Sequence, residues 1–117
     1  MIDSHKEIVA ALSAILPTHY EATLTADTDV PCISYMEYSN RDELAGETLG
    51  YSIVAYQVKV WGTNLGLIQT YAKRVDSAVR ALGFTRTGSA EVQDRLSNMI
   101  QKVLIYEAVG FEHYNND

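Results

Sequence analysis

The fold is decided by the stretch from Tyr51 to Gly88, YSIVAYQVKVWGTNLGLIQTYAKRVDSAVRALGFTRTG. Its first part alternates between two kinds of side chain. One set is mainly apolar and β-branched, and polar or mixed residues fall between its members: Ser52, Val54, Tyr56, Val58 and Val60 against Ile53, Ala55, Gln57, Lys59 and Trp61. A period of two predicts a strand with one buried face.

The second part of this stretch changes to a helical period. Thr63 or Asn64 can cap a helix, and Gly83 stands where a helix end favours a residue that tolerates positive φ. Between them, apolar residues recur along one side: Ile68, Tyr71, Ala72, Val75, Val79 and Leu82. The sequence therefore predicts a strand followed directly by an amphipathic helix.

An N-terminal helix is predicted on the same grounds. Ser4 and Glu7 have the spacing of a capping box, and Pro17 prevents the helix from continuing. Its apolar stripe is formed by Ile8, Leu12, Ile15 and Leu16. Such a stripe packs one face of the helix on a sheet.

The remaining strands are predicted from shorter patterns. We expect strands at Glu21–Thr25, Cys32–Tyr38, Phe84–Thr87 and Ile100–Phe111, with a polar excursion over Gly88–Asn98. The order of elements predicts an α+β fold, in which a mainly antiparallel sheet of four to five strands carries both helices on one face. Residues 1–112 are expected to form a single domain, and 113–117 a flexible tail.

The segment from Ser39 to Gly50 breaks the strand pattern, because it combines turn formers and charges with few apolar residues. We interpret it as a long exposed hairpin loop. Long loops in compact domains often carry function, so its candidate contacts with a neighbouring subunit or partner are Arg41, Asp42, Glu43 and Glu47. A merely solvated connection is the alternative.

Trp61 is a further candidate contact. It is expected on the strand face that carries Gln57 and Lys59, at a rim or interface where tryptophan contributes strongly to binding. The alternative is that it caps the end of the sheet.

Composition limits the possible functions. Nine Lys and Arg against fifteen Asp and Glu give a net charge of −6, which argues against binding of phosphate backbones. The single cysteine, Cys32, lies in an apolar run and is expected to be a packed thiol. With no apolar run long enough to cross a bilayer and no signal-peptide pattern, the protein is expected to be soluble and intracellular at synthesis.

Motifs for catalysis are missing from the sequence. The three histidines, His5, His19 and His113, lack metal-ligand spacing, and neither a nucleophile elbow nor a phosphate-binding loop occurs. The carboxylate pairs Asp42/Glu43 and Glu91/Asp94 fall in polar segments where their charges are solvated. The sequence therefore predicts a non-enzymatic protein without a metal or cofactor.

In the order of its elements, nearly the whole chain resembles the small tail-terminator or tail-completion proteins of long-tailed bacteriophages. The resemblance covers the helix of Ile8–Leu16, the strands around Val30–Tyr35 and Tyr56–Gly62, the helix end at Val75–Phe84, and the final strand to Tyr106 and Phe111. It consists of pattern similarities and includes no catalytic motif.

The resemblance implies a structural virion protein at the head-proximal end of the tail. Such proteins form a homo-oligomeric ring, commonly of six subunits, which stops growth of the tail tube and joins it to the head. The implied partners are the tail-tube protein and the head-tail connector or stopper protein. DNA would pass through the ring without specific binding, and an acidic lumen would repel it.

Two other classes of function remain open. One is a small dimeric ligand-binding or regulatory α+β module. The other is a hydrolase with dispersed acidic residues.

Overall fold

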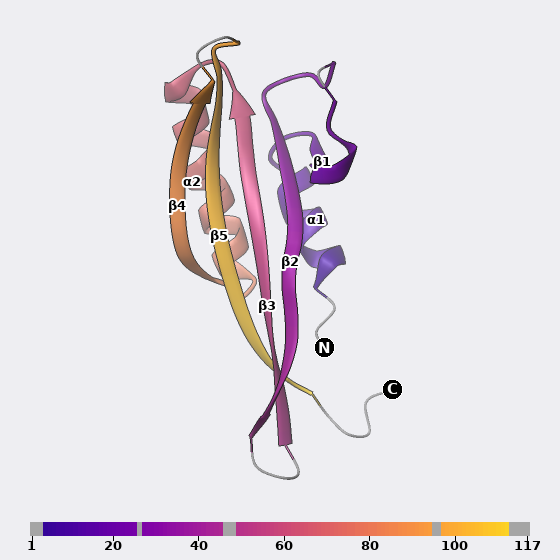
Figure 1. The fold of residues 1–117 in the computed structure, drawn as a ribbon. Helices are drawn as coiled ribbons and strands as arrows, with labels where there is room; N and C mark the ends of the chain where they lie inside the picture. The colour runs from indigo at the N-terminus through magenta and orange to yellow at the C-terminus, as the bar shows by residue number, and fades with distance from the viewer. Residues whose placement is uncertain (1–3, 26, 46–48, 95–96, 113–117) are drawn as a thin grey trace.

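The computed structural model of the protein describes residues 4–25, 27–45, 49–94 and 97–112. Its elements follow one another in the order α1 (His5–Ser13), β1 (Thr18–Tyr20), the 3₁₀ helix η1 (Glu21–Thr23), β2 (Cys32–Ala45), β3 (Leu49–Gly62), α2 (Leu65–Ala81), β4 (Thr85–Asp94) and β5 (Met99–Glu112). The strands form one sheet in the order β1-β2-β3-β5-β4, antiparallel throughout except between β1 and β2. Both α-helices lie on one face of it (Figure 1). The predicted α+β fold is confirmed.

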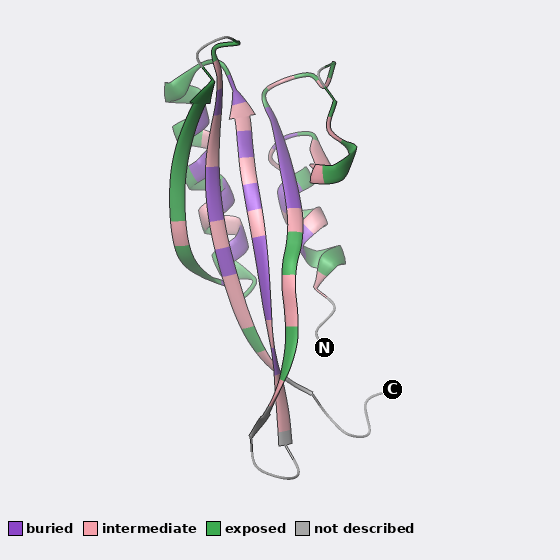
Figure 2. Ribbon diagram, in the orientation of Figure 1, coloured by how far each residue is buried: buried purple, intermediate pink, exposed green. Residues whose placement is uncertain are grey.

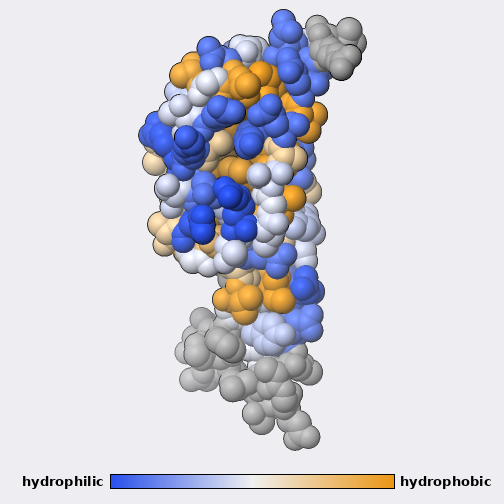
Figure 3. Space-filling model, turned by 90° about the vertical axis from the view of Figure 1, so that its left-hand side faces the viewer, coloured by the Kyte–Doolittle hydropathy of each residue, from blue (hydrophilic) through white to orange (hydrophobic). Residues whose placement is uncertain are grey.

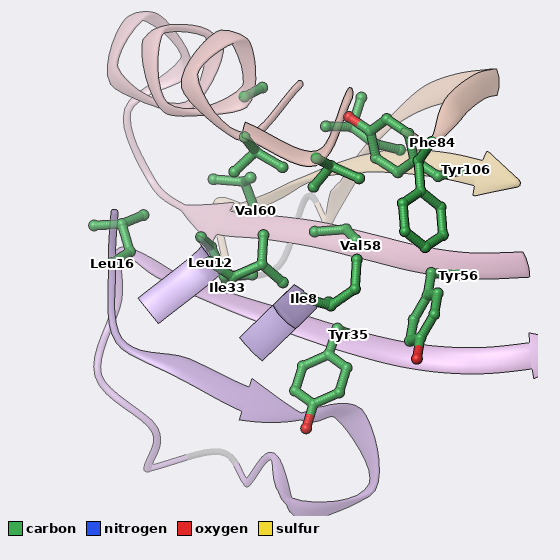
Figure 4. Close-up of a cluster of buried hydrophobic side chains, with 14 of the residues drawn as sticks. Ile8, Leu12, Leu16, Ile33, Tyr35, Tyr56, Val58, Val60, Phe84 and Tyr106 are labelled. Carbon is green, nitrogen blue, oxygen red and sulfur yellow. The ribbon is translucent and has the colours of Figure 1, made fainter. Parts of the chain in front are cut away.

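Strand β3 is the centre of the sheet and alternates as predicted. The side chains of Val54, Tyr56, Val58 and Val60 are fully buried on the helix-bearing face, and the burial colours along β3 follow this alternation (Figure 2). Residues from both helices, from the segments that follow them and from the flanking strands complete the core: Ile8, Leu12, Leu16, Ile33, Tyr35, Ile68, Ala72, Val75, Val79, Phe84, Ile100, Leu104 and Tyr106. Figure 4 shows Tyr56 beside Phe84, whose rings meet edge to face with their centroids 5.8 Å apart.

The ends of α2 confirm the sequence signals. The side-chain Oδ1 of Asn64 accepts a hydrogen bond from the backbone N–H of Leu67, at 3.1 Å, and so caps the helix. Gly83 follows the helix with a φ of 99°, in the left-handed region that side chains with a Cβ disfavour. Leu82 departs from the expected stripe and is exposed.

The capping box predicted for α1 is wrong. Ser4 occupies the N-cap position but makes no side-chain capping bond. Its hydroxyl instead donates to the phenol oxygen of Tyr56, at 3.4 Å. The serine hydroxyl therefore bonds to a core tyrosine that lies 52 residues further along the chain. The spacing of residues near Ser4 in the sequence does not predict this partner.

The loop predicted over Ser39–Gly50 is also wrong. Strand β2 continues to Ala45 and β3 begins at Leu49, and the two pair in register from Cys32 with Trp61 to Ala45 with Leu49. Asn40 is partly buried and Arg41 and Asp42 are exposed. The ladder satisfies the backbone here, while the described side chains in this part of β2 are polar and exposed or partly buried, so the apolar alternation that marks a half-buried strand is missing.

Two further strand predictions need correction for related reasons. Gly88 to Asp94, expected within a polar excursion, belongs to β4, an edge strand that is exposed at every position except the partly buried Gly88. The segment Glu21–Thr25 begins with the 3₁₀ helix η1, where the Thr23 hydroxyl donates to the carbonyl of Tyr20 at 2.7 Å. The strand lies immediately before it, at β1.

The molecule is elongated, with principal extents of 53 × 23 × 23 Å. The helices cover one end of the sheet, while β2, β3 and the end of β5 extend beyond them (Figure 1). We call residues 41–45 and 49–53, the end of this β2–β3 hairpin, the arm. The predicted tail, 113–117, lies outside the described residues.

Candidate functional site

The arm carries three of the predicted contact residues on its β2 strand. Arg41 and Glu43 lie on one face, where Arg41 Nε donates to Glu43 Oε1 at 3.1 Å. Asp42 lies on the opposite face and accepts a hydrogen bond from Ser52 Oγ at 2.7 Å. Since successive strand residues alternate between faces, the arm presents polar groups on both sides. Glu47, the fourth predicted contact, lies outside the described residues.

Trp61 belongs to a different part of the molecule. It pairs with Cys32 near the helix-covered end of β3, whereas Ser52 pairs with Asp42 in the arm. The nine residue-to-residue steps from Ser52 to Trp61 span about 30 Å of strand. Among the residues that the structure describes, Trp61 is therefore not brought together with the predicted contact residues of the arm.

Trp61 lies on the sheet face opposite the helices and is held in place by polar contacts. Its indole Nε1 donates to Ser34 Oγ at 2.8 Å, and the Lys59 ammonium lies 5.7 Å from the ring centroid. Lys59 also forms an ion pair with Glu21, at 3.0 Å. These contacts fix the orientation of the ring within the sheet face.

A pocket of about 410 Å³ opens beside Trp61 at the end of the sheet, with a largely apolar lining: Leu24, Thr25, Thr28, Val30, Cys32, Trp61, Asp94, Ser97, Met99 and Gln101. Cys32 is 1% exposed, and burial raises the pKa of its thiol. The expected packed thiol is confirmed, because a raised pKa disfavours the reactive thiolate.

A polar cluster joins α2 to strands β4 and β5. Asp76 on α2 accepts a hydrogen bond from the buried Tyr106 hydroxyl at 2.8 Å, and forms ion pairs with Arg86 at 3.3 Å and Arg80 at 3.5 Å. Burial, followed by the hydrogen bond and charge of Asp76, holds the pKa of Tyr106 well above its ordinary value. Only the i, i+4 spacing of Asp76 and Arg80 was visible in the sequence, because the other partners come from distant strands.

Within residues 4–25, 27–45, 49–94 and 97–112, no three or more His, Cys, Asp or Glu side chains form a group that could hold a metal ion. His5 instead lies within hydrogen-bond distance of the Tyr35 hydroxyl, 3.2 Å from its Nε2. Among the same described residues, neither helix combines the length and apolarity needed to cross a membrane.

Comparison with solved structures identifies a clear likeness. One chain in a structure described as "Virion of native gene transfer agent (GTA) particle" superposes with a TM-score of 0.64, covering 90% of this chain and 84% of that chain. The two chains share a fold. Their sequences are 14% identical, so the likeness concerns the fold alone. No protein-family model matches the sequence, and a search of the curated proteins gave no significant match.

Proposed function

We propose that this chain is a non-enzymatic structural protein of a virion. In this proposal it forms a homo-oligomeric ring at the head-proximal end of a tail, ends the growth of the tail tube and joins the tail to the head. Its partners are the tail-tube protein and the head-tail connector or stopper protein.

The observation that carries the proposal is the shared fold with a chain of a gene transfer agent virion. The likeness extends over 90% of this chain and 84% of the other, so it includes nearly the whole architecture of each. The resemblance of the sequence to tail-terminator proteins supports the same general class, a structural protein of a virion. The sequence resemblance supplies the more specific assignment to the end of a tail.

The arm gives the proposal a physical means of assembly. A projection formed by β2 and β3, with the end of β5 paired to β3, carries polar residues on both faces and exposes surface that a neighbouring subunit or another virion protein can cover. The net charge of −6 suits a ring through which DNA passes, because an acidic channel does not retain a polyanion.

The size of the purified full chain tests this proposal. Light scattering from about 1 μM to about 1 mM, followed by negative-stain imaging, should show closed rings of about six subunits with an open centre. A small dimer at every concentration would contradict the ring. If the protein is a monomer at every concentration, assembly should be tested on tail tips, because subunits of this kind can assemble on a partner.

The pocket beside Trp61 favours a second candidate, a small dimeric ligand-binding module. Its volume of about 410 Å³ and largely apolar lining are within the range of small-molecule sites. Trp61 is the single tryptophan of the chain, so saturable quenching of its fluorescence by apolar ligands would support this function. Rings without such binding would support the virion role.

A further inference from the structure

A cleft of about 360 Å³ lies between α2 and the outer strands β4 and β5. Its polar lining consists of Gln69, Lys73, Asp76, Arg86, Ser89 and Lys102. Figure 3 views the molecule from the side of α2 and β4, where strongly hydrophilic residues gather between smaller hydrophobic areas. The cleft shares no lining residue with the pocket beside Trp61.

The helix and the inner of the two strands direct polar side chains toward this cleft by their regular periods. Gln69, Lys73 and Asp76 recur at helical spacing and so lie on one side of α2. On β5, Lys102 lies two residues before the buried Leu104 and therefore on the helix-bearing face of the sheet.

A β-bulge in β4 brings Arg86 and Ser89 to the same face of the sheet. Residues three apart in a regular strand point to opposite faces. Arg86 stands opposite Tyr106 on β5, and after the register shift at the bulge Ser89 stands opposite Leu104. Both partners on β5 are buried in the core on the helix-bearing face. The bulge thus supplies the cleft with a guanidinium and a hydroxyl together, and bulges that re-aim a side chain are common beside functional sites.

The carboxylate in the lining of the cleft already has its partners. Asp76 accepts a hydrogen bond from the Tyr106 hydroxyl at 2.8 Å, and it forms ion pairs with Arg86 at 3.3 Å and Arg80 at 3.5 Å. It therefore has little capacity to neutralise a further cation.

Two ammonium groups of the cleft have no such compensation. Neither Lys73 nor Lys102 has an ion-pair partner among the residues that the structure describes. A second carboxylate in this region is that of Glu91, the exposed register partner of Lys102 on β4. Two lysines and two arginines thus stand against two carboxylates around the cleft, so an anion that enters it gains more attraction than repulsion.

The chemistry of the donors favours a compact, multiply charged oxyanion. Apart from Asp76, every polar side chain of the lining can donate hydrogen bonds: two ammonium groups, a guanidinium, a hydroxyl and an amide. A phosphate group carries nearly two charges and at least three acceptor oxygens, whereas a carboxylate carries one charge and two oxygens. The described lining residues include no aromatic side chain that could stack on a nucleobase.

The charge of the remaining surface favours a small ligand over a phosphate backbone. At an ionic strength of about 0.1 M, exposed charges more than about 10 Å apart are largely screened from each other. A small anion in the cleft therefore responds mainly to the nearby cations. A nucleic acid would extend beyond the cleft over the surface of a protein whose net charge is −6, which repels it.

We propose that this cleft binds a small phosphate-bearing anion. The principal donors are the ammonium groups of Lys73 and Lys102 and the guanidinium of Arg86, with the Ser89 hydroxyl beside them. This binding function goes beyond the proposed ring and does not depend on it.

Inorganic pyrophosphate is the probe, titrated by calorimetry into the full chain in a phosphate-free buffer. Wild type should bind about one pyrophosphate per chain, with a dissociation constant below about 1 mM at low salt. Lys73→Gln and Lys102→Gln should each weaken binding about tenfold, because each removes a charge-assisted hydrogen bond to the anion.

Arg74→Gln is the matched control, because it changes the net charge by the same amount as each lysine variant. Arg74 is also an exposed cation on α2, but it lies over the Tyr71 ring and does not line the cleft. Its affinity for pyrophosphate should stay within about twofold of wild type. Circular dichroism verifies that every variant is folded.

Each other outcome overturns a defined part of the inference. The absence of saturable binding up to about 10 mM pyrophosphate would overturn the site itself. An equal loss of affinity in Arg74→Gln would overturn its location, since binding would then follow net charge. Malonate that binds as tightly as pyrophosphate would overturn the choice of phosphate. A short DNA duplex that binds more tightly than pyrophosphate, and is released in both lysine variants, would overturn the choice of a small ligand.

Discussion

The hydroxyl of Tyr106 on β5 donates to Oδ1 of Asp76 on α2, at 2.8 Å, and so fastens the helix to the sheet. Tyr106 is fully buried, and Asp76 also holds Arg80 and Arg86. One carboxylate thus connects α2, β4 and β5. The contribution of this hydrogen bond to the free energy of unfolding can be measured, and so can the effect of the raised Tyr106 pKa on stability.

Tyr106→Phe is expected to lower the free energy of unfolding by about 1–2 kcal/mol, because Asp76 loses its buried donor. Urea unfolding at pH 7 measures the change. Tyr71→Phe is the control, since Tyr71 is only partly buried and should cost less than about 0.5 kcal/mol. Equal losses in the two variants would contradict a special role for the Tyr106 bond.

Alkaline pH should destabilise the protein partly through the same residue. The pKa of Tyr106 is raised in the folded state, so its neutral form is fully present in both states below the ordinary value near 10. Above that pH the unfolded chain releases the proton and the folded chain retains it. Stability should then fall by up to about 1.4 kcal/mol per pH unit from this group. Tyr106→Phe should have a shallower slope between about pH 9.5 and 11.

Asn64→Ala is expected to cost about 1 kcal/mol, because α2 loses the side-chain bond to the N–H of Leu67. Ser4→Ala is the matched comparison at the start of α1. Ser4 makes no capping bond, and its 3.4 Å contact with Tyr56 is long, so its loss should cost less than about 0.5 kcal/mol. Chemical denaturation of both variants measures the difference, and a larger loss for Ser4→Ala would contradict it.

Gly83→Ala is expected to destabilise the protein by about 1 kcal/mol or more, because its φ of 99° is unfavourable for a residue with a Cβ. The cause is conformational, since a Cβ at this position would meet nothing within 4 Å. Gly66→Ala is the control within α2. An added Cβ there reaches only ordinary contact, 3.5 Å from Asn64 Oδ1, and the change should gain about 0.5 kcal/mol in a thermal melt. We therefore expect the stability of the protein to fall in Gly83→Ala and to rise in Gly66→Ala.

A shortened hairpin should remain folded but fail to assemble. Replacing residues 41–53 with Asn-Gly joins Asn40 to Val54, which are already register partners, through a two-residue turn. Every member of the hydrophobic core cluster lies outside the deleted segment. Sedimentation velocity should show a smaller species with a retained cooperative unfolding transition.

The control for this deletion keeps the arm and removes its internal ion pair. Arg41→Gln with Glu43→Gln eliminates the 3.1 Å bond between two exposed side chains, so both stability and assembly should change little. If the shortened protein assembles as wild type does, the arm is not an assembly element.

The fold could be predicted wherever burial leaves a period in the sequence. The buried residues from Val54 to Val60 recur at every second position, and those from Ile68 to Val79 recur at helical spacing, because one side of each element packs in the core. The same reasoning failed for the β2 side of the arm and for β4, because these strands are held by backbone pairing while their described side chains are mostly polar and exposed or partly buried. Polar residues in these segments were therefore interpreted as loops.

The candidate contact residues were likewise predictable from the sequence only in part. The sequence identified Arg41, Asp42 and Glu43 as exposed polar residues, but gave no sign that they stand on a paired projection. It also grouped them with Trp61, which lies far along β3. The sequence also gave no indication that Lys73, Arg86 and Lys102 line one cleft, because they come from three elements whose proximity depends on the strand order β3-β5-β4.

The sequence by itself determined the class of the fold, the central strand, the limits of α2 and the burial of Cys32, because each follows from local spacing, capping or an apolar neighbourhood. Only the tertiary structure decided the length of the hairpin arm, the partner of Ser4, and the junction of Tyr106 with Asp76. These features depend on pairing and packing between segments far apart in the chain, and such contacts leave no periodic mark on either segment.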